Sequence, residues 1–157
     1  LYPASSDQEA GLAKNAIGND DARMTNFLLA TQGKNTAKNK SFIYFWTHPA
    51  PGPNSDRQGA FHGSEVNYVF DNFYATDRPW TDQDRKIADI MSSYWANFAA
   101  KGDPNGPGLP KWDAVSKDAP VVMEVGERFG PLPVAEKPRM DFIRKFYLSN
   151  STSGGWR

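Results

Sequence analysis

The run Ser-Phe-Ile-Tyr-Phe-Trp-Thr at residues 41–47 most strongly constrains the fold. It consists mainly of aromatic and β-branched residues, without the alternation of a strand that has one face in water. Strands buried on both faces, as in the parallel sheets of α/β proteins, show this pattern. We therefore expect a buried strand here, followed by an irregular loop over residues 48–60, whose first part holds three prolines.

Helical patterns lie on both sides of this strand. A capping box from Ser6 to Glu9 predicts a helix over residues 5–17, and a second helix is expected over about 21–31, ended by Gly33. The clearest helix begins after Thr81, a good N-cap with acidic residues in the first turn. It carries one apolar stripe and ends at Gly102 and Pro104.

The last part of the chain adds a strand and a helix to this pattern. Residues 120–125 resemble a short strand, and a last helix is expected to pack one face on the body through Phe142, Ile143, Phe146 and Tyr147. Strands that alternate with helices place the chain in the α/β class. We expect a single domain over residues 1–148 and a flexible tail over 149–157.

The composition excludes several classes of protein and suggests an incomplete core. The formal net charge is zero, which argues against a nucleic-acid partner, and no apolar run is long enough to span a membrane. There is no cysteine, which excludes disulfides and thiolate metal sites. Leu, Ile, Val and Phe make up only 29 of the 157 residues. We therefore expect this chain to be part of a larger fold that a further stretch of polypeptide completes.

The residues able to carry catalysis are few. The chain has two histidines, no Gly-x-Ser-x-Gly nucleophile elbow, and no nucleotide-binding glycine motif. The segment over residues 59–70 is the exception, because it places His62 between an aromatic residue and a glycine on a turn that apolar residues flank. An imidazole held at a surface cleft is suited to act as a general base. The plainer alternative is a histidine that bonds only within its own loop.

Three segments make the chain recognisable. They are Gly59-Ala-Phe-His-Gly-Ser-Glu-Val-Asn-Tyr-Val-Phe70, Tyr94-Trp-Ala-Asn-Phe-Ala-Ala-Lys-Gly-Asp-Pro-Asn105 and Leu109-Pro-Lys-Trp112. In order and approximate spacing they resemble the C-terminal part of the type-B carboxylesterases, a family that includes the cholinesterases. The resemblance covers nearly the whole chain. It implies the last strands of an α/β-hydrolase sheet with their packing helices, in a serine hydrolase of carboxylic esters.

The resemblance also implies residue roles. His62, in the pattern His-Gly-x-Glu, matches the catalytic histidine of the family. In that family the nucleophilic serine and the triad acid precede the matched region, so we expect both on an upstream portion or a second chain. Phe61 is then a candidate pocket residue, and Glu65 is expected to orient a neighbouring loop or to cap the short helix after Gly63. We expect the 157 residues alone to be inactive.

Alternative interpretations remain for these residues. His48 is expected at the end of the strand, bonded to nearby backbone, or else at the entrance of the active site. His62 and Glu65 do not form a closed metal site, and no cofactor is expected. The alternative function is a non-catalytic, cholinesterase-like adhesion domain, although the retained His-Gly-x-Glu favours an enzyme. Family resemblance places the protein outside the cell or in the periplasm, with a small ester as its substrate.

Overall fold

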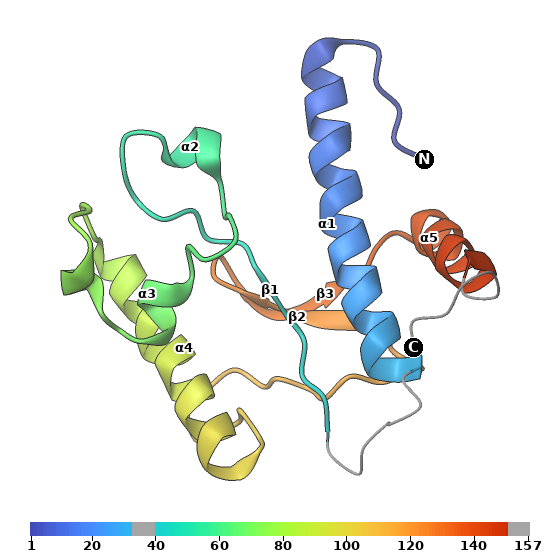
Figure 1. The fold of residues 1–157 in the computed structure, drawn as a ribbon. Helices are drawn as coiled ribbons and strands as arrows, with labels where there is room; N and C mark the ends of the chain where they lie inside the picture. Colours follow the sequence, from blue (N-terminus) through green and yellow to red (C-terminus); the bar gives the residue numbers. More distant parts are fainter. Residues whose placement is uncertain (33–39, 151–157) are drawn as a thin grey trace. The chain divides into compact units, whose positions relative to one another are not determined.

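A computed structural model describes residues 1–32 and 40–150 (Figure 1). Its contacts divide the chain into two compact units. The first comprises Leu1–Ala37, Val115–Val122 and Pro133–Arg157, and the second comprises Lys38–Ala114 and Met123–Leu132. A single domain over residues 1–148 stays a prediction. The predicted tail falls mainly outside the described residues, although the last helix includes residues 149 and 150.

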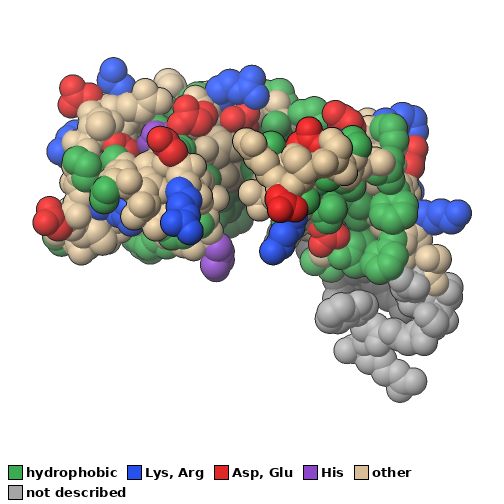
Figure 2. Space-filling model, turned by 90° about the horizontal axis from the view of Figure 1, so that it is seen from above, with side chains coloured by type: hydrophobic (Ala, Val, Ile, Leu, Met, Phe, Trp, Pro, Cys, Tyr) green, Lys and Arg blue, Asp and Glu red, His purple; other side chains and the backbone are tan. Residues whose placement is uncertain are grey.

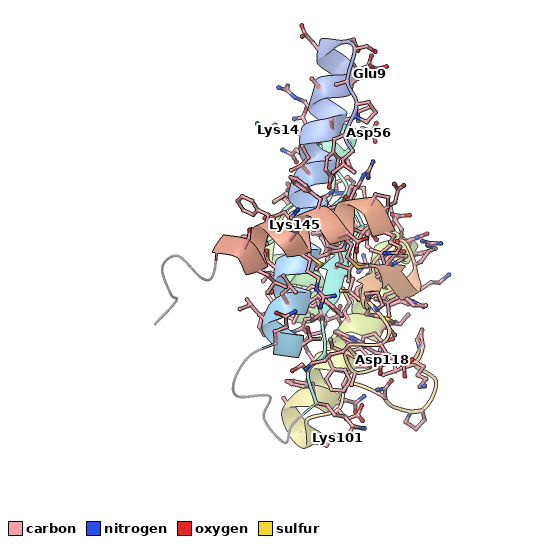
Figure 3. The ribbon with its side chains drawn as sticks, turned by 90° about the vertical axis from the view of Figure 1, so that its right-hand side faces the viewer. Glu9, Lys14, Asp56, Lys101, Asp118 and Lys145 are labelled. Carbon is pink, nitrogen blue, oxygen red and sulfur yellow. The ribbon has the colours of Figure 1, made fainter. Side chains whose placement is uncertain are left out.

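The first unit is built from helix α1 (Asp7–Gln32) and helix α5 (Lys137–Asn150), which pack on one another. Figure 3 shows α5, marked by Lys145, crossing α1, which is marked by Glu9 and Lys14. The prediction of two helices is wrong, because α1 runs unbroken past Gly18. Buried Asp20 pairs with Arg23 at 2.5 Å and accepts a hydrogen bond from the Tyr2 hydroxyl at 2.9 Å. These contacts stabilise the helix where propensity is weak. The expected stop at Gly33 lies outside the described residues.

The buried face of α5 is narrower than the sequence pattern predicts. Ile143 is buried, but Phe142 and Phe146 are 56% and 54% exposed. Tyr147 is half-buried and donates to the Asp21 carboxylate of α1 at 2.9 Å. Figure 2 shows hydrophobic side chains on the surface of the molecule. The apolar spacing therefore identified the helix correctly and overestimated its contact face.

A mixed three-stranded sheet in the order β1-β2-β3 lies mainly in the second unit. The strands are β1 (Tyr44–Trp46), β2 (Val121–Val125) and β3 (Phe129–Pro133). The predicted strands at 41–47 and 120–125 are therefore present, but the first is shorter, and the expectation that it is buried on both faces is wrong, since only Trp46 is buried and Tyr44 and Phe45 are half-buried. Strand β1 runs parallel to β2, with Trp46 opposite Val125. The sequence pattern does not predict β3, because the strand contains two prolines and proline within sheets is confined to edge strands, strand starts and bulges.

Helix α4 (Asp82–Lys101) covers the core of the second unit. Its predicted start is confirmed by a complete capping box between Thr81 and Asp84, and its end by a left-handed Gly102. The short helices α2 (Ser55–Gln58), α3 (Val66–Val69) and η1 (Phe73–Ala75) lie between β1 and α4 in the chain, and α3 packs on α4. The buried core is mostly aromatic: Trp46, Tyr68, Phe73, Ile87, Ala88, Met91, Tyr94, Trp112, Met123 and Val125.

Candidate active site

His62 lies on a tight turn immediately before α3. The turn closes through the Phe61 carbonyl, which accepts hydrogen bonds from the Ser64 backbone amide at 3.0 Å and from the Ser64 hydroxyl at 2.7 Å. Gly63 has a φ of +88°, which an L side chain rarely adopts. The His62 side chain is exposed, and within residues 1–32 and 40–150 its imidazole makes no hydrogen bond or ion pair. The histidine is therefore at the surface, and its role as a general base stays a prediction.

Strand β1 holds this turn from one side. Tyr44 and Trp46 are two residues apart and share a face of the strand. The Trp46 indole donates to the Ser64 hydroxyl at 2.8 Å, and the Tyr44 hydroxyl donates to the Glu65 carboxylate at 3.3 Å. Glu65 occupies the N-cap position of α3 but makes no side-chain cap. Of its two expected roles, capping is therefore wrong, and the side chain contacts β1 instead.

The Tyr44–Glu65 contact affects how the phenol ionises. Burial, followed by the charge and the hydrogen bond of Glu65, raises the pKa of Tyr44 to about 12. The phenol is therefore neutral at physiological pH and acts as a donor. A neutral donor beside the carboxylate fixes Glu65 next to the His62 turn without adding a second charge there.

His48 lies between two carboxylates, which corrects the expectation that it bonds to backbone. Its Nδ1 is 2.6 Å from Glu127 Oε1, and its Nε2 is 2.9 Å from Asp84 Oδ1. Only 12% of the side chain is exposed. Both ring nitrogens thus lie within hydrogen-bond distance of a carboxylate oxygen. The ring links the chain beyond β1 to the start of α4 and to the residues between β2 and β3.

Asp84 is the buried centre of this cluster. Asp84 is only 1% exposed. Its carboxylate accepts hydrogen bonds from the Thr81 backbone amide at 2.7 Å and from the Tyr68 hydroxyl at 2.6 Å. Burial acts to raise the pKa of Asp84, but hydrogen bonds from Thr81, Tyr68 and His48 outweigh it and hold that pKa below 3.8. The buried charge is thus satisfied from three elements of the second unit.

Comparison with known proteins identifies the family. Residues 14–142 match the carboxylesterase family. This chain is a member of that family. It is 30% identical over 129 residues to bile salt-activated lipase of Homo sapiens, covering 80% of this chain and 17% of that protein.

Two further relatives carry esterase names. The chain is 36% identical over 81 residues to carboxylesterase 4A of Bos taurus, covering 49% of the chain and 14% of the relative. It is 37% identical over 67 residues to acetylcholinesterase 1 of Caenorhabditis briggsae, covering 41% and 11%. The chain thus matches less than a fifth of the length of each of these three proteins.

Within this carboxylesterase segment, the structure brings only some of the predicted site residues together. Glu65 lies beside the His62 turn, Phe61 is 42% exposed next to it, and His48 belongs to the separate carboxylate cluster. Sequence analysis missed Ser64 and Trp46, which hold the turn, because no local motif joins residues 18 positions apart. It found Asp84 only as an acidic residue of a helix start.

In residues 1–32 and 40–150, no group of three or more metal-ligating side chains is placed to hold an ion. No helix in the same ranges is both long and apolar enough to cross a membrane. The second unit also contains a mostly aromatic cavity of about 180 Å³ beside β1 and α4. The cavity is lined by Phe42, Tyr44, Tyr94, Trp95, Phe98, Pro104 and Trp112.

Proposed function

We propose that this chain supplies the general base of a serine carboxylesterase, and that the base is His62. One observation carries the proposal: in a carboxylesterase-family segment, His62 is exposed on a turn whose following residues, Ser64 and Glu65, are hydrogen-bonded to Trp46 and Tyr44 of β1. A general base needs an accessible imidazole held within hydrogen-bond reach of the proton that it removes. The local pattern His-Gly-x-Glu, which carries the resemblance to the family's catalytic histidine, supports the same role.

In the proposed mechanism, His62 takes the proton of a serine hydroxyl as that oxygen attacks the ester carbonyl. The imidazolium then returns a proton to the departing alcohol, which leaves an acyl-enzyme. Water then attacks the acyl-enzyme as His62 removes its proton, and the carboxylic acid is released as the imidazolium returns that proton to the serine oxygen. A carboxylate on the second ring nitrogen would hold the required tautomer and stabilise the imidazolium.

We infer that the serine and this carboxylate come from polypeptide outside these 157 residues. The sequence contains no Gly-x-Ser-x-Gly elbow, and the match covers only a minor share of each relative. The triad of α/β-hydrolases runs in the order serine, acid, histidine, so a segment that carries the histidine follows the other two members. The parallel pair β1 and β2 is consistent with the last strands of such a sheet.

The substrate is proposed to be a carboxylic ester with an apolar portion. Phe61, directly before His62 and 42% exposed, offers an apolar contact at the site. A protein of this family is proposed to act outside the cell or in the periplasm.

The test uses the complete polypeptide that contains these residues and a nitrophenyl ester of a short-chain acid. His62→Ala is expected to lower kcat/KM by about 10³-fold or more, since loss of a triad member removes general acid and base catalysis. Gln58→Ala, an exposed position in the preceding helix α2, is the matched control and should retain activity. The isolated 157 residues should hydrolyse the ester no faster than their own His62→Ala variant. Retained activity in the full-length His62→Ala enzyme would refute the proposal.

The second candidate, an adhesion domain on the same fold, makes a different prediction. It requires that the complete polypeptide lack the serine of a Gly-x-Ser-x-Gly elbow. The retained histidine favours the enzyme. Sequencing the polypeptide that precedes Leu1, or any chain that co-purifies, distinguishes the two.

A further inference from the structure

We propose that Ser64 is a positioning residue for His62, held for this purpose by the indole of Trp46. This proposal rests on the function proposed above. Ser64 is the only buried residue between Phe61 and Val66, all of which the structure describes. Its hydroxyl donates to the Phe61 carbonyl at 2.7 Å and accepts from Trp46 Nε1 at 2.8 Å. The hydroxyl hydrogen is therefore already engaged, and Ser64 is not free to act as a nucleophile.

The atom that Ser64 binds explains why the bond affects His62. The Phe61 carbonyl belongs to the peptide group that joins Phe61 to His62, so the bond fixes the plane in which the His62 Cα lies. On the other side, Gly63 is the residue with the fewest steric limits. The Ser64 hydroxyl therefore constrains the orientation of His62 from its N-terminal side.

Trp46 gives Ser64 a fixed reference. Trp46 pairs with Val125 in the sheet. Its indole packs against the buried Tyr68 ring, with a distance of 4.9 Å between the ring centroids. Tyr68 in turn donates to Asp84, the buried carboxylate at the start of α4. The indole N–H thus donates from the buried core to the turn, and this bond is the shorter of the two that join β1 to the segment that carries the proposed base, the other being the Tyr44–Glu65 bond at 3.3 Å.

This arrangement matters because proton transfer depends strongly on position. A displacement of about 1 Å at a reacting group can cost a factor of about 10² in rate. Without the Ser64 hydroxyl, only the 3.0 Å bond from the Ser64 amide would close the turn on Phe61. The imidazole would remain present and exposed, but it would occupy the productive orientation for less of the time.

The experiment compares Ser64→Ala and Trp46→Phe in the complete esterase. Trp46→Phe keeps an aromatic ring and removes the N–H donor. Each variant is expected to lower kcat by about 10- to 100-fold with KM within about twofold of the parent, because the turn is misplaced rather than the substrate pocket. The double variant should lose no more than the worse single variant, since both changes break the same link.

Trp112→Phe is the matched control. Trp112 is as buried as Trp46, and within the described residues its indole nitrogen has no hydrogen-bond partner. This variant should keep kcat. The proposal is overturned if Ser64→Ala and Trp46→Phe keep kcat within twofold, or if kcat falls only in proportion to the fraction of unfolded enzyme. If Ser64→Ala fails to fold, Trp46→Phe decides by the same criteria. An active His62→Ala enzyme would instead overturn the proposed function, and this inference with it.

Discussion

Replacing Tyr68 with Phe tests whether the buried carboxylate cluster stabilises the second unit. The change removes one hydroxyl that donates to Asp84 at 2.6 Å, while the ring stays in the core. A hydrogen bond to a charged group contributes about 1.5 to 3 kcal/mol. The free energy of opening of helices α3 and α4 should fall by that amount. Amide hydrogen exchange of α4 in the native protein should then accelerate roughly 10- to 150-fold.

Tyr94→Phe provides the comparison on the same helix. Tyr94 is also fully buried and donates across 2.6 Å, but its acceptor is the neutral carbonyl of Pro110. A neutral hydrogen bond contributes about 0.5 to 1.5 kcal/mol, so exchange should accelerate only about 2- to 12-fold. Equal effects of the two variants, or a larger effect of Tyr94→Phe, would refute the view that Asp84 holds its charge through these donors.

Three further predictions concern pH and backbone geometry. Because folding lowers the pKa of Asp84, its charge stabilises the protein above about pH 4, and this stabilisation is lost as the pH falls through the pKa of the folded state. Urea unfolding should show Asp84→Asn to be less stable than the parent at neutral pH, and the difference in unfolding free energy should narrow in acid. Because the pKa of Tyr44 is raised from 10.0 to about 12, the associated stability is present below pH 10 and lost by pH 12; Tyr44→Phe should lack this alkaline loss in the same assay. Gly126→Ala should lower the free energy of unfolding by about 2 to 5 kcal/mol, since φ is +131° and the new Cβ would lie 2.7 Å from the His48 amide nitrogen. Gly130→Ala, whose Cβ would meet no atom within 4 Å, should change it by less than about 1 kcal/mol. Similar unfolding midpoints for the two variants would contradict the steric argument.

Local patterns predicted those elements whose signals lie within a few residues. The N-cap at Thr81, the end of α4 at Gly102 and the strand before His48 are all determined by adjacent side chains, and each is present. The sequence pattern wrongly divides helix α1 between residues 17 and 21, where the contacts of Asp20 with Tyr2 and Arg139 come from distant parts of the chain. Propensity alone does not contain those contacts.

The candidate site shows the same division. His62 stands out because a histidine beside a glycine is rare in this sequence and the segment resembles a known family. The partners of His48 lie 36 and 79 residues away, and those of Ser64 include a residue 18 positions earlier. Both sets meet only after the sheet and α4 have formed. A pattern within one segment therefore singles out His62 as the candidate base but does not contain the residues that support its turn.

The spacing of Tyr44, Trp46 and His48 has a consequence for insertions and deletions. These alternate positions reach Glu65, Ser64 and the Asp84 carboxylate in turn. A shift of one residue in the pairing of β1 with β2 would turn all of them away at once and present Phe45 and Thr47 instead. Lengthening the proline-rich loop over residues 49–54, between β1 and α2, should leave that pairing intact. The tolerance of the protein to changes in chain length should therefore drop sharply at the boundary between strand and loop.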